Sequence, residues 1–397
     1  MKVVYFSHSD GIYGAPKSLI DLIEQLKKEC RDFYPIVVTS KKNALNSYCQ
    51  KHGIENYSVY YTDCLYGYEK NRTLKQIIHD MRVYIKMNFR YHTLNQLAIN
   101  KICKLIDFTD VDLIHTNVST IDIGFFISQK YGIPHIWHIR EYGKSGSYSF
   151  LPYSRMYYQR IISANYVIYI SKYVKNNWEC CFLNKEKAMV VYDVVKKVNF
   201  NSNRVDSNKI RILFSGSSTP AKGIMDLINA INLVVTQKNN LIISVDIYGD
   251  YNDEFGKEVK KLVSQYALEK VITFKGFDSG LTDKMTEYDI GVIGSRSEAF
   301  GRITIEYMSA GLYIVATNSG ANPELLETLK FKKMYQFGNS MELAERLIDI
   351  IESVSDWNDI RVNAYEGALR INDSSRLARV MMEMYYDSIR GVRKNEN

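Results

Sequence analysis

Glu298-Ala299-Phe300-Gly301-Arg302-Ile303-Thr304-Ile305-Glu306 is the stretch that decides the fold. An apolar run over residues 289–295 comes directly before it and predicts a buried strand, while residues 303–311 predict a helix. A strand, a turn and a helix in this order place Gly301 at a helix N-terminus. The free backbone N–H groups and the dipole at such an end favour an anion.

The two carboxylates of this stretch, Glu298 and Glu306, stand eight positions apart. We expect Glu298 in the turn and Glu306 about one turn into the helix. Ordinary helix capping also explains such a pair, because the dipole stabilises a carboxylate near a helix start by up to about 1 kcal/mol. The same groups suit a phosphorylated sugar, since N–H groups can hold the phosphate and carboxylates can hold the hydroxyls.

Composition predicts a globular protein of two domains. The chain has 397 residues, of which 46% are hydrophobic and 24% are charged. Residues 1–200 carry 27 Lys and Arg against 17 Asp and Glu, whereas the remainder carries 24 against 27. We therefore expect the basic half to meet an anionic partner or surface.

The ends and cysteines of the chain predict a cytoplasmic location. No apolar run reaches the roughly 18 residues that span a bilayer, and residues 1–8 turn polar too soon for a signal peptide and predict a first buried strand. The six cysteines lack metal-ligand spacing and are expected to be free thiols: Cys30, Cys49, Cys64, Cys103, Cys180 and Cys181.

Short apolar runs alternate with amphipathic stretches through both halves. Strands are predicted over residues 3–7, 34–40, 113–116, 133–139 and 166–170, and then over 211–215, 243–248, 271–274, 290–293, 314–317 and 334–336. Helices are predicted over residues 15–30, 357–370 and 375–390. The residue composition changes over residues 191–208, and we interpret this segment as an interdomain linker. The pattern predicts two doubly wound parallel α/β domains.

Residues 297–301, 306–311 and 315–325 together resemble the C-terminal signature of glycosyltransferase family four. The E-x7-E motif of that family matches Glu298 and Glu306. The resemblance implies a retaining enzyme of GT-B fold, with two Rossmann-like domains facing a central cleft. It implies an acceptor-side domain over residues 1–195, a nucleotide-sugar domain over 208–374, and a helix over 375–397 that crosses back to the first domain.

Residues 212–223 read as a strand followed by a loop of small residues with Lys222 at its exit, which suits a phosphate. The loop resembles the family's G-R-x-x-x-x-K-G motif, whose Arg and Lys hold the donor diphosphate. Gly216 and Lys222 match that motif, but Ser217 stands where the Arg is usual. We hypothesise that Arg302 supplies the missing charge. The alternative is that Lys222 is an ordinary solvated residue.

The resemblance implies further site residues in both halves. Gly14 follows the first strand where the family keeps a glycine loop, although a plain tight turn also explains it. His138 matches the family histidine that hydrogen-bonds the transferred sugar, and His115 is expected to lie behind it. Gly276 and Phe277 lie where the family places the nucleobase, although a buried Phe beside a turn glycine explains them equally well. The amides of residues 300–302 are expected to stabilise the departing diphosphate.

Two other patterns bear on cofactors and partners. Asp110-Val111-Asp112 spells a metal-binding D-x-D, but it precedes a strand, away from the ligand-binding edge, and we predict no metal. Residues 71–104 interleave apolar residues with seven basic ones: Arg72, Lys75, Arg82, Lys86, Arg90, Lys101 and Lys104. They predict either a solvated helical pair or basic amphipathic helices on an anionic membrane surface, at the inner face of the membrane.

The chain is therefore interpreted as a metal-independent, retaining hexosyl- or N-acetylhexosaminyltransferase that uses a nucleoside-diphosphate sugar. The expected acceptor is a glycan or a lipid-linked molecule of cell-surface polysaccharide synthesis, and no nucleic-acid partner is expected. Two alternatives stay open. One is a sugar-nucleotide epimerase or hydrolase of the same fold, and the other is a non-catalytic partner subunit.

Overall fold

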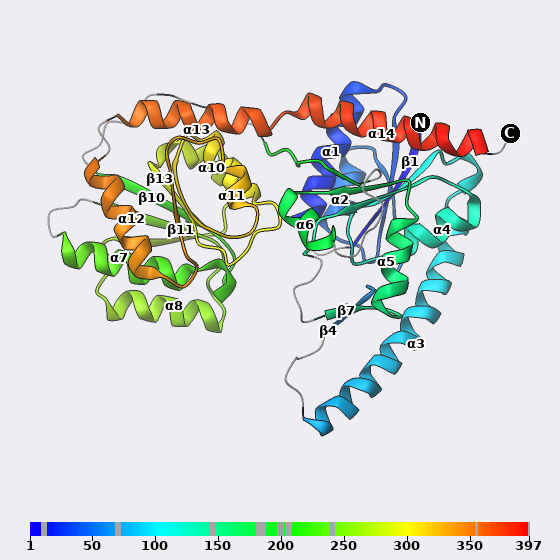
Figure 1. Cartoon of the computed structure of the whole chain (residues 1–397), viewed down its shortest axis with the longest axis horizontal. Coiled ribbons are helices and arrows are strands. Elements are labelled where there is room, and N and C mark those ends of the chain that lie inside the picture. The colour runs from blue at the N-terminus through cyan, green and yellow to red at the C-terminus, as the bar shows by residue number, and fades with distance from the viewer. Residues whose placement is uncertain are drawn as a thin grey trace. The chain divides into compact units, whose positions relative to one another are not determined.

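The computed structural model describes residues 1–8, 14–67, 73–142, 148–179, 188–196, 198, 200, 202, 209–238, 243–353 and 356–395. The chain forms two compact units, each with its own sheet (Figure 1). Unit 1 comprises Met1–Val194 and Ser374–Asn397, and unit 2 comprises Val195–Asp373. The last helix therefore belongs to the unit that contains the N-terminus.

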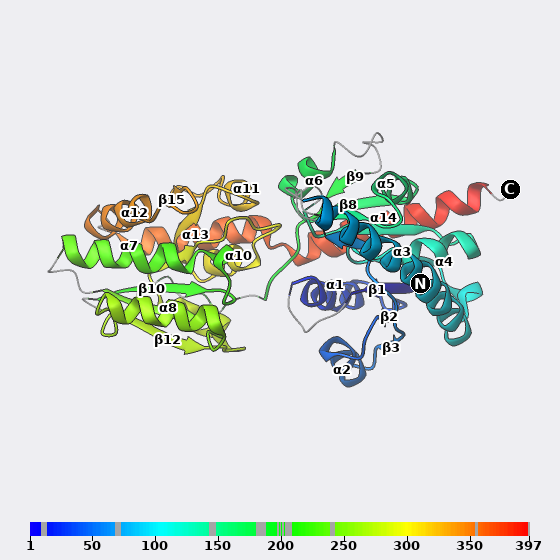
Figure 2. The same ribbon diagram turned by 90° about the horizontal axis from the view of Figure 1, so that it is seen from below.

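Unit 1 is built on a parallel sheet with the strand order β3-β2-β1-β5-β6-β8-β9. These strands are β1 (Lys2–Ser7), β2 (Tyr34–Thr39), β3 (Glu55–Ser58), β5 (Leu113–Thr116), β6 (His135–Ile139), β8 (Tyr166–Tyr169) and β9 (Ala188–Val190). Figure 2 shows β1, β2 and β3 following one another toward α2. An antiparallel pair, β4 (Leu65–Gly67) and β7 (Tyr148–Phe150), stands apart from this sheet.

Helices cover both faces of the unit 1 sheet. They are α1 (Ala15–Glu29), α2 (Ala44–Lys51), α3 (Leu74–Leu105), α4 (Ile123–Tyr131), α5 (Ser154–Ile162), α6 (Lys172–Glu179) and α14 (Ser374–Asn395), with a 3-10 turn η1 (Phe108–Asp110). Alternation along β1 sends Val3 and Tyr5 toward α1 and α14, and Val4 and Phe6 toward α3 and α4. Both faces of the strand are thus buried.

Unit 2 repeats the architecture with the parallel strand order β12-β11-β10-β13-β14-β15. Its strands are β10 (Ile210–Ser215), β11 (Ile243–Tyr248), β12 (Ile272–Gly276), β13 (Ile290–Ile293), β14 (Tyr313–Thr317) and β15 (Lys332–Tyr335). Its helices are α7 (Ile224–Gln237), α8 (Glu254–Gln265), α9 (Leu281–Lys284), α10 (Arg302–Ser309), α11 (Asn322–Leu325), α12 (Ser340–Ser353) and α13 (Trp357–Ile371), with 3-10 turns η2 (Pro220–Lys222) and η3 (Met285–Glu287).

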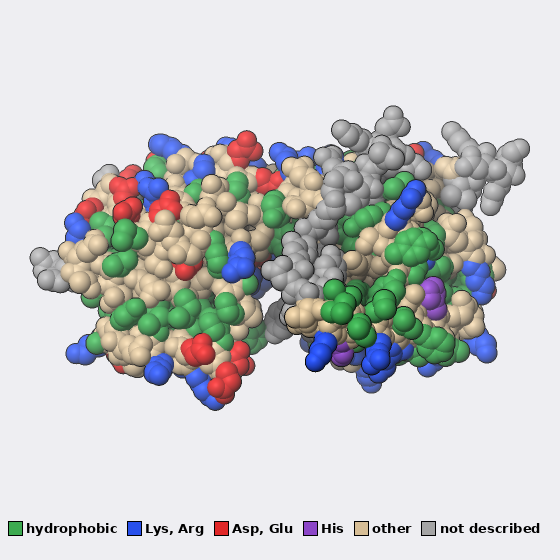
Figure 3. All heavy atoms as spheres, turned by 60° about the horizontal axis from the view of Figure 1, so that its bottom comes forward, with side chains coloured by type: hydrophobic (Ala, Val, Ile, Leu, Met, Phe, Trp, Pro, Cys, Tyr) green, Lys and Arg blue, Asp and Glu red, His purple; other side chains and the backbone are tan. Residues whose placement is uncertain are grey.

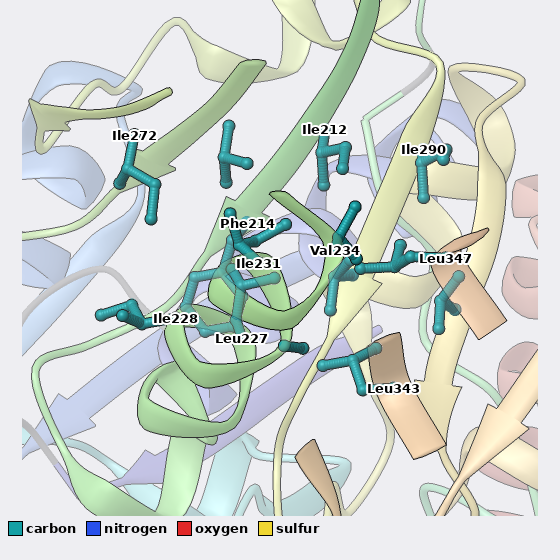
Figure 4. Close-up of a cluster of buried hydrophobic side chains, with 14 of the residues drawn as sticks. Ile212, Phe214, Leu227, Ile228, Ile231, Val234, Ile272, Ile290, Leu343 and Leu347 are labelled. Atoms are coloured by element: carbon teal, nitrogen blue, oxygen red, sulfur yellow. The ribbon is translucent and has the colours of Figure 1, made fainter. Parts of the chain in front are cut away.

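The sheet of unit 2 is likewise buried on both faces. Ile212 and Phe214 of β10 pack with α7, α8 and α12, as the buried cluster in Figure 4 shows for α7 and α12. Leu213 points to the opposite face, where it joins a cluster that includes Tyr307 of α10 and Ala368 of α13. The strongly apolar strands that the sequence displays follow from this double burial.

The predicted strands all exist, with ends shifted by at most two residues. The expected α/β class is confirmed, with one parallel sheet in each half of the chain. One expectation was wrong: the basic segment is not a helical pair, because residues 74–105 form the single helix α3, whose capping box at Thr73 and Gln76 marks its start. Asn71 and Arg72 lie outside the described residues.

The expected linker needs a correction at its beginning. Asp193 is buried, with 3% of its surface exposed, and it pairs with Arg140 inside unit 1. Val195 belongs to unit 2, where its N–H donates to Asn372 Oδ1 at 2.8 Å. Of residues 196–208, only 196, 198, 200 and 202 are described.

Candidate active site

The carboxyl ends of β10 and β13 meet at the point where the strand order of unit 2 reverses. β10 pairs with β11 on one side and with β13 on the other. Ligands of doubly wound sheets bind in the crevice beyond such a switch point. The loops after these two strands carry Gly216 to Lys222 and Gly294 to Gly301, which include Glu298 and half of the predicted donor-binding residues.

The structure joins Lys222 and Glu298 directly. The Lys222 ammonium lies 2.6 Å from Glu298 Oε1, and the Ser295 hydroxyl donates to the same oxygen at 2.5 Å. Both donors that contact this carboxylate in the described part of the chain do so at Oε1. The arrangement leaves Glu298 Oε2 able to accept further hydrogen bonds.

Glycines allow the loops of this site to approach one another. Gly223 adopts φ 70°, and a Cβ there would lie 2.1 Å from the Gly294 carbonyl oxygen. Gly320 adopts φ 63°, and a Cβ would lie 2.4 Å from the Glu298 amide nitrogen. The Ala321 N–H also donates to the Glu298 carbonyl at 2.9 Å. The backbone of Glu298 is therefore held by the turn after β14.

Polar side chains brace the same turn from beneath. The Thr317 hydroxyl donates to the Ser295 carbonyl at 2.6 Å, and Asn322 Nδ2 lies 3.3 Å from the Thr317 hydroxyl. The Thr304 hydroxyl donates to Asn322 Oδ1 at 2.9 Å. Thr304, Thr317 and Asn322 are all fully buried. These hydrogen bonds link the end of β14 to the first turn of α10.

Helix α10 begins where the sequence predicted. Gly301 is its N-cap, with φ 85° and ψ 56°, and in the described structure no side-chain hydrogen bond caps the helix. Phe300 is buried with 3% exposure, so its ring belongs to the core and only its backbone can face a ligand. Arg302 and Glu306 are half-buried on the first turns of α10.

The predicted base-binding residues lie at the end of β12. Phe277 is 60% exposed, which argues against the buried-Phe alternative. The Gly276 carbonyl accepts from the Gly249 N–H at 3.0 Å, and the Gly216 N–H donates to the Tyr248 carbonyl at 3.0 Å. These two hydrogen bonds connect the carboxyl ends of β10, β11 and β12, so Gly216 and Gly276 lie at the same edge of the sheet. Ser217 is exposed beside them.

In unit 1, His138 lies near the carboxyl end of strand β6 with 1% exposure. Arg140 Nη2 lies 3.3 Å from His138 Nδ1. Because a guanidinium can only donate, Nδ1 is the acceptor and the neutral ring carries its proton on Nε2. No group among the described residues forms a hydrogen bond with that Nε2.

Burial holds His138 neutral. Desolvation lowers its pKa well below the ordinary value, and the charges of Arg140 and His115 lower it further. Burial likewise lowers the pKa of His115, whose Nδ1 lies 2.7 Å from the Tyr385 hydroxyl. A group with so low a pKa accepts a proton poorly at neutral pH. His138 is therefore suited to hydrogen bonding and not to acting as a base.

A buried ion pair positions Arg140 beside His138. Arg140 Nη1 lies 2.5 Å from Asp193 Oδ2, and only 3% and 4% of the two side chains are exposed. Arg140 Nε donates to Asn117 Oδ1 at 3.0 Å. The neighbouring Glu141 accepts from the Ser119 N–H at 2.7 Å and from its hydroxyl at 2.6 Å.

Sequence reasoning missed the supporting residues of both sites. Asp193 lay in the segment interpreted as linker, and no local pattern marks it as the partner of Arg140. Gly320 and Ser295 stand inside or beside the quoted motifs, but only the fold brings them to Glu298. Gly14 has φ 55° and caps α1, and a Cβ there meets nothing within 4 Å. Residues 9–13, which precede it, lie outside the described residues.

The D-x-D pattern lies where it was expected, before β5. Asp110 ends η1, and its carboxylate lies 3.1 Å from Lys2 Nζ. Asp112 Oδ2 accepts from the Lys2 N–H at 2.8 Å. Across the described ranges, no three His, Cys, Asp or Glu residues gather as metal ligands. No helix in those ranges is long and apolar enough to cross a membrane.

Comparisons with known proteins identify what this chain is similar to. Residues 195–367 match the family model described as "Glycosyl transferases group 1". An uncharacterized glycosyltransferase of Methanocaldococcus jannaschii is 25% identical over 294 residues, which cover 72% of this chain and 78% of that protein. N-acetyl-alpha-D-glucosaminyl L-malate synthase of Bacillus anthracis is 23% identical over 47% of each chain.

Solved structures match nearly the whole chain. Anabaena HepE in complex with UDP superposes with a TM-score of 0.75 at 19% identity, covering 98% of this chain and 100% of that one. A glycosyltransferase of Rickettsia africae superposes with a TM-score of 0.73 at 18% identity, covering 98% of each. These likenesses establish the fold as GT-B. The chain therefore has the GT-B fold, resembles a glycosyltransferase over 72% of its length, and matches the group 1 glycosyltransferase model over residues 195–367.

Proposed function

We propose that this chain is a retaining glycosyltransferase of family four that moves a sugar from a UDP-sugar to a glycan or lipid-linked acceptor. The observation that carries the proposal is the contact of Lys222 with Glu298 at the switch point of unit 2. One loop thereby offers a cation for a diphosphate, and the other offers a carboxylate for sugar hydroxyls. The UDP complex of Anabaena HepE supports uridine as the base.

Different residues of unit 2 bind different parts of the donor. Glu298 Oε2 accepts from sugar hydroxyls, and Glu306 accepts from the ribose. Lys222 and the amides of residues 300–302 stabilise the charge that grows on the departing diphosphate. Gly276 lets the base approach the backbone, and the exposed ring of Phe277 stacks on it.

The transfer exchanges one bond at the anomeric carbon for another. The bond to the diphosphate oxygen breaks and UDP leaves with its electron pair. The acceptor hydroxyl oxygen bonds to the same carbon on the same face of the sugar, and its proton passes to the departing diphosphate oxygen. His138 donates from Nε2 to a sugar hydroxyl and orients the ring. We propose that none of these steps needs a metal ion, because Lys222 and the helix α10 N-terminus supply positive charge at the diphosphate.

We test the reaction by incubating the full chain with UDP-sugars and GDP-sugars, with and without a membrane or glycan extract as the acceptor. A transferase incorporates label only when the acceptor is present. Turnover without an acceptor identifies an epimerase or hydrolase and contradicts the proposal. Full function of Glu298→Gln identifies a non-catalytic subunit and also contradicts it.

We further propose that α3 rests on an anionic membrane surface during cell-surface polysaccharide synthesis, which makes the chain a cytoplasmic, peripheral protein. The first half of α3 exposes an apolar stripe at three- and four-residue spacing: Leu74, Ile77, Ile78, Met81, Ile85 and Phe89. Leu74, Phe89 and Ile85 are 75%, 70% and 63% exposed. Lys75, Arg82 and Lys86 are exposed on the same helix, which holds six Lys and Arg and one Asp. Apolar and basic faces together suit an anionic bilayer.

Figure 1 shows the N-terminal end of α3 reaching beyond the unit 1 sheet, and Figure 3 shows hydrophobic side chains beside Lys and Arg on unit 1. The double variant Ile85→Ser, Phe89→Ser is expected to weaken binding to phosphatidylglycerol vesicles by roughly tenfold or more, since each buried apolar side chain contributes about 1.5–3 kcal/mol. Met341→Ser serves as the control, because Met341 is 63% exposed on unit 2. Salt-independent binding, or equal loss in both variants, contradicts the proposal.

A further inference from the structure

Unit 1 contains a pocket that none of the residues discussed so far explains. Its volume is about 330 Å³, and it is lined by His8, Ser40, Lys41, Tyr60, Tyr61, Thr62, Asp63, Leu65, Met87, Arg90 and Leu151. All of these residues belong to unit 1, so the pocket does not depend on where unit 2 lies. The loops after β1, β2 and β3 form one wall, and α3 forms another.

The pocket shares an edge of the sheet with His138. His8 directly follows β1, and Lys41 follows β2 by two residues, so both lie at the carboxyl ends of parallel strands. His138 lies near the carboxyl end of β6, which is separated from β1 by β5 alone. Two strand spacings amount to about 10 Å. A ligand in the pocket can therefore reach toward the sugar that His138 orients.

Two cations of the pocket are available to a ligand. Lys41 and Arg90 are both exposed, and neither takes part in an ion pair within the described ranges. His8 adds a ring nitrogen, since its Nδ1 is buried and contacts no partner in the described structure. Asp63 is the one carboxylate of the lining. Two cations against one carboxylate favour an anionic ligand, and the carboxylate suits a hydroxyl of the same ligand.

Aromatic rings complete the lining. The Tyr61 hydroxyl donates to the Ser7 carbonyl at 2.7 Å, which fixes its ring against the end of β1. Tyr60 is 49% exposed, so its ring can cover a bound group. Aromatic faces pack on apolar C–H surfaces such as those of a sugar ring. The lining thus combines an anion site, a hydroxyl site and an apolar wall.

We propose that this pocket binds the acceptor and that the acceptor carries a phosphate or carboxylate on a group of about monosaccharide size. The volume lies at the lower end of small-ligand pockets, which run from roughly 300 to 1,000 Å³. Lys41 and Arg90 hold the anion, Asp63 accepts from a hydroxyl, and Tyr60 packs on the ring. The assignment of this ligand as the acceptor rests on the proposed function.

The position of Arg90 connects the pocket to the apolar stripe of α3. Met87 and Arg90 line the pocket, while Phe89 between them is 70% exposed on the stripe. An anion held by Arg90 can therefore come from a lipid headgroup at a membrane surface or from a free anionic glycan. The shared chemistry is the phosphate or carboxylate, and the experiment separates the two sources.

The test uses glucose 6-phosphate as the anionic probe and glucose as its neutral counterpart, titrated calorimetrically into the full chain. Glucose 6-phosphate is expected to bind more tightly than glucose. The double variant Lys41→Ala, Arg90→Ala is expected to weaken this binding by about tenfold or more, because it removes two charge-assisted contacts. Lys101→Ala, Lys104→Ala removes the same charge from exposed positions of α3 outside the pocket and is expected to leave it unchanged.

Phosphatidylglycerol vesicles provide the second arm. A headgroup source predicts that the Lys41, Arg90 variant loses more vesicle binding than the Lys101, Lys104 variant, whereas a free-glycan source predicts a difference for glucose 6-phosphate alone. The proposal is overturned when neither probe distinguishes the two variants. UDP binding is measured on the same proteins: a chain that binds UDP but not the anionic probes refutes the pocket, and a chain that binds the probes but not UDP refutes the donor site.

Discussion

Lys222 and Glu298 lie 76 positions apart in the chain, yet their charged atoms are 2.6 Å apart. Glu298 is mostly buried and Lys222 is one-third exposed, so one partner is held in place while the other remains accessible from solvent. A cation with this freedom can turn from a carboxylate to a phosphate without moving the backbone. We therefore propose this pair as the residue-level basis of donor binding.

Substitution of Arg302 tests whether this residue supplies the positive charge that the family has at the position of Ser217. We predict that Arg302→Ala weakens UDP binding by roughly tenfold, the loss of one charge-assisted contact, when measured by calorimetry. Arg296→Ala is the matched control, because Arg296 lies in the loop that precedes α10 but is exposed and stacks over the Phe337 ring. An unchanged dissociation constant in Arg302→Ala, or equal losses in the two variants, would show that Arg302 does not replace the missing Arg.

At the scale of elements, the turn after β14 fixes the position of Glu298. The only direct backbone hydrogen bond described between these turns runs from Ala321 to the Glu298 carbonyl. Gly320 makes the approach possible, because any side chain would overlap the Glu298 backbone. Two adjacent strands thus carry separate turns that lie against each other.

We predict that Gly320→Ala lowers the transfer rate by tenfold or more because the new Cβ displaces the Glu298 turn. Gly338→Ala is the control: Gly338 also has a positive φ, 83°, but a Cβ there meets nothing within 4 Å. Both variants bear the strain of a left-handed conformation, about 1–2 kcal/mol. If the two variants lose stability and transfer rate alike, strain alone explains the glycine, and the proposed contact has no catalytic importance.

A buried network ties three helices of unit 1 together. Asp122 Oδ2, before α4, accepts from the Tyr91 hydroxyl of α3 at 2.5 Å and pairs with Arg160 of α5. Asp122→Ala leaves the buried Arg160 guanidinium without its carboxylate, so the free energy of unfolding is expected to fall by about 3–5 kcal/mol in urea titration. Glu254→Ala breaks an exposed pair with Lys257 and is expected to change little. Similar stabilities for the two variants would contradict the importance of this network.

For the whole molecule, the fold could be predicted from the sequence because most of its strands are short apolar runs. Runs such as residues 211–215 and 290–293 are buried on both faces, so their composition alone identifies them. β3 (Glu55–Ser58) escaped prediction because it is an edge strand with polar residues, and β9 (Ala188–Val190) because it is short. Glu298, Lys222 and Gly301 stand out in the sequence because each belongs to a local motif, and their roles in the site stay predictions. The contacts of Asp193 and Ser295 and the pocket of unit 1 could not be predicted, because tertiary packing alone assembles them.

Three buried histidines give unit 1 a pH-dependent stability. Burial lowers the pKa of His135 to about 3, and it holds those of His115 and His138 well below the ordinary value. As the pH falls below about 6.5, the unfolded chain binds protons that the folded chain refuses, so stability is lost. Each such histidine contributes a slope of up to about 1.4 kcal/mol per pH unit.

Urea unfolding between pH 7.5 and pH 5 measures this slope. We predict that His135→Gln, which removes one titrating group beside Thr116, reduces the slope relative to the wild-type chain. The comparison of slopes is independent of any constant loss of stability in the variant. Identical slopes in both proteins would contradict the assignment of His135 as a neutral buried group.

The central claim is that unit 2 holds a nucleotide-sugar diphosphate beside Lys222 and Glu298. The most direct measurement is a calorimetric titration of the full chain with UDP, comparing the wild type with Lys222→Met and with Lys257→Met as an exposed control. The account predicts that the wild type and Lys257→Met bind UDP with equal affinity and that Lys222→Met binds about tenfold or more weakly. Absence of UDP binding in the wild type, or equal affinity in Lys222→Met, would contradict it.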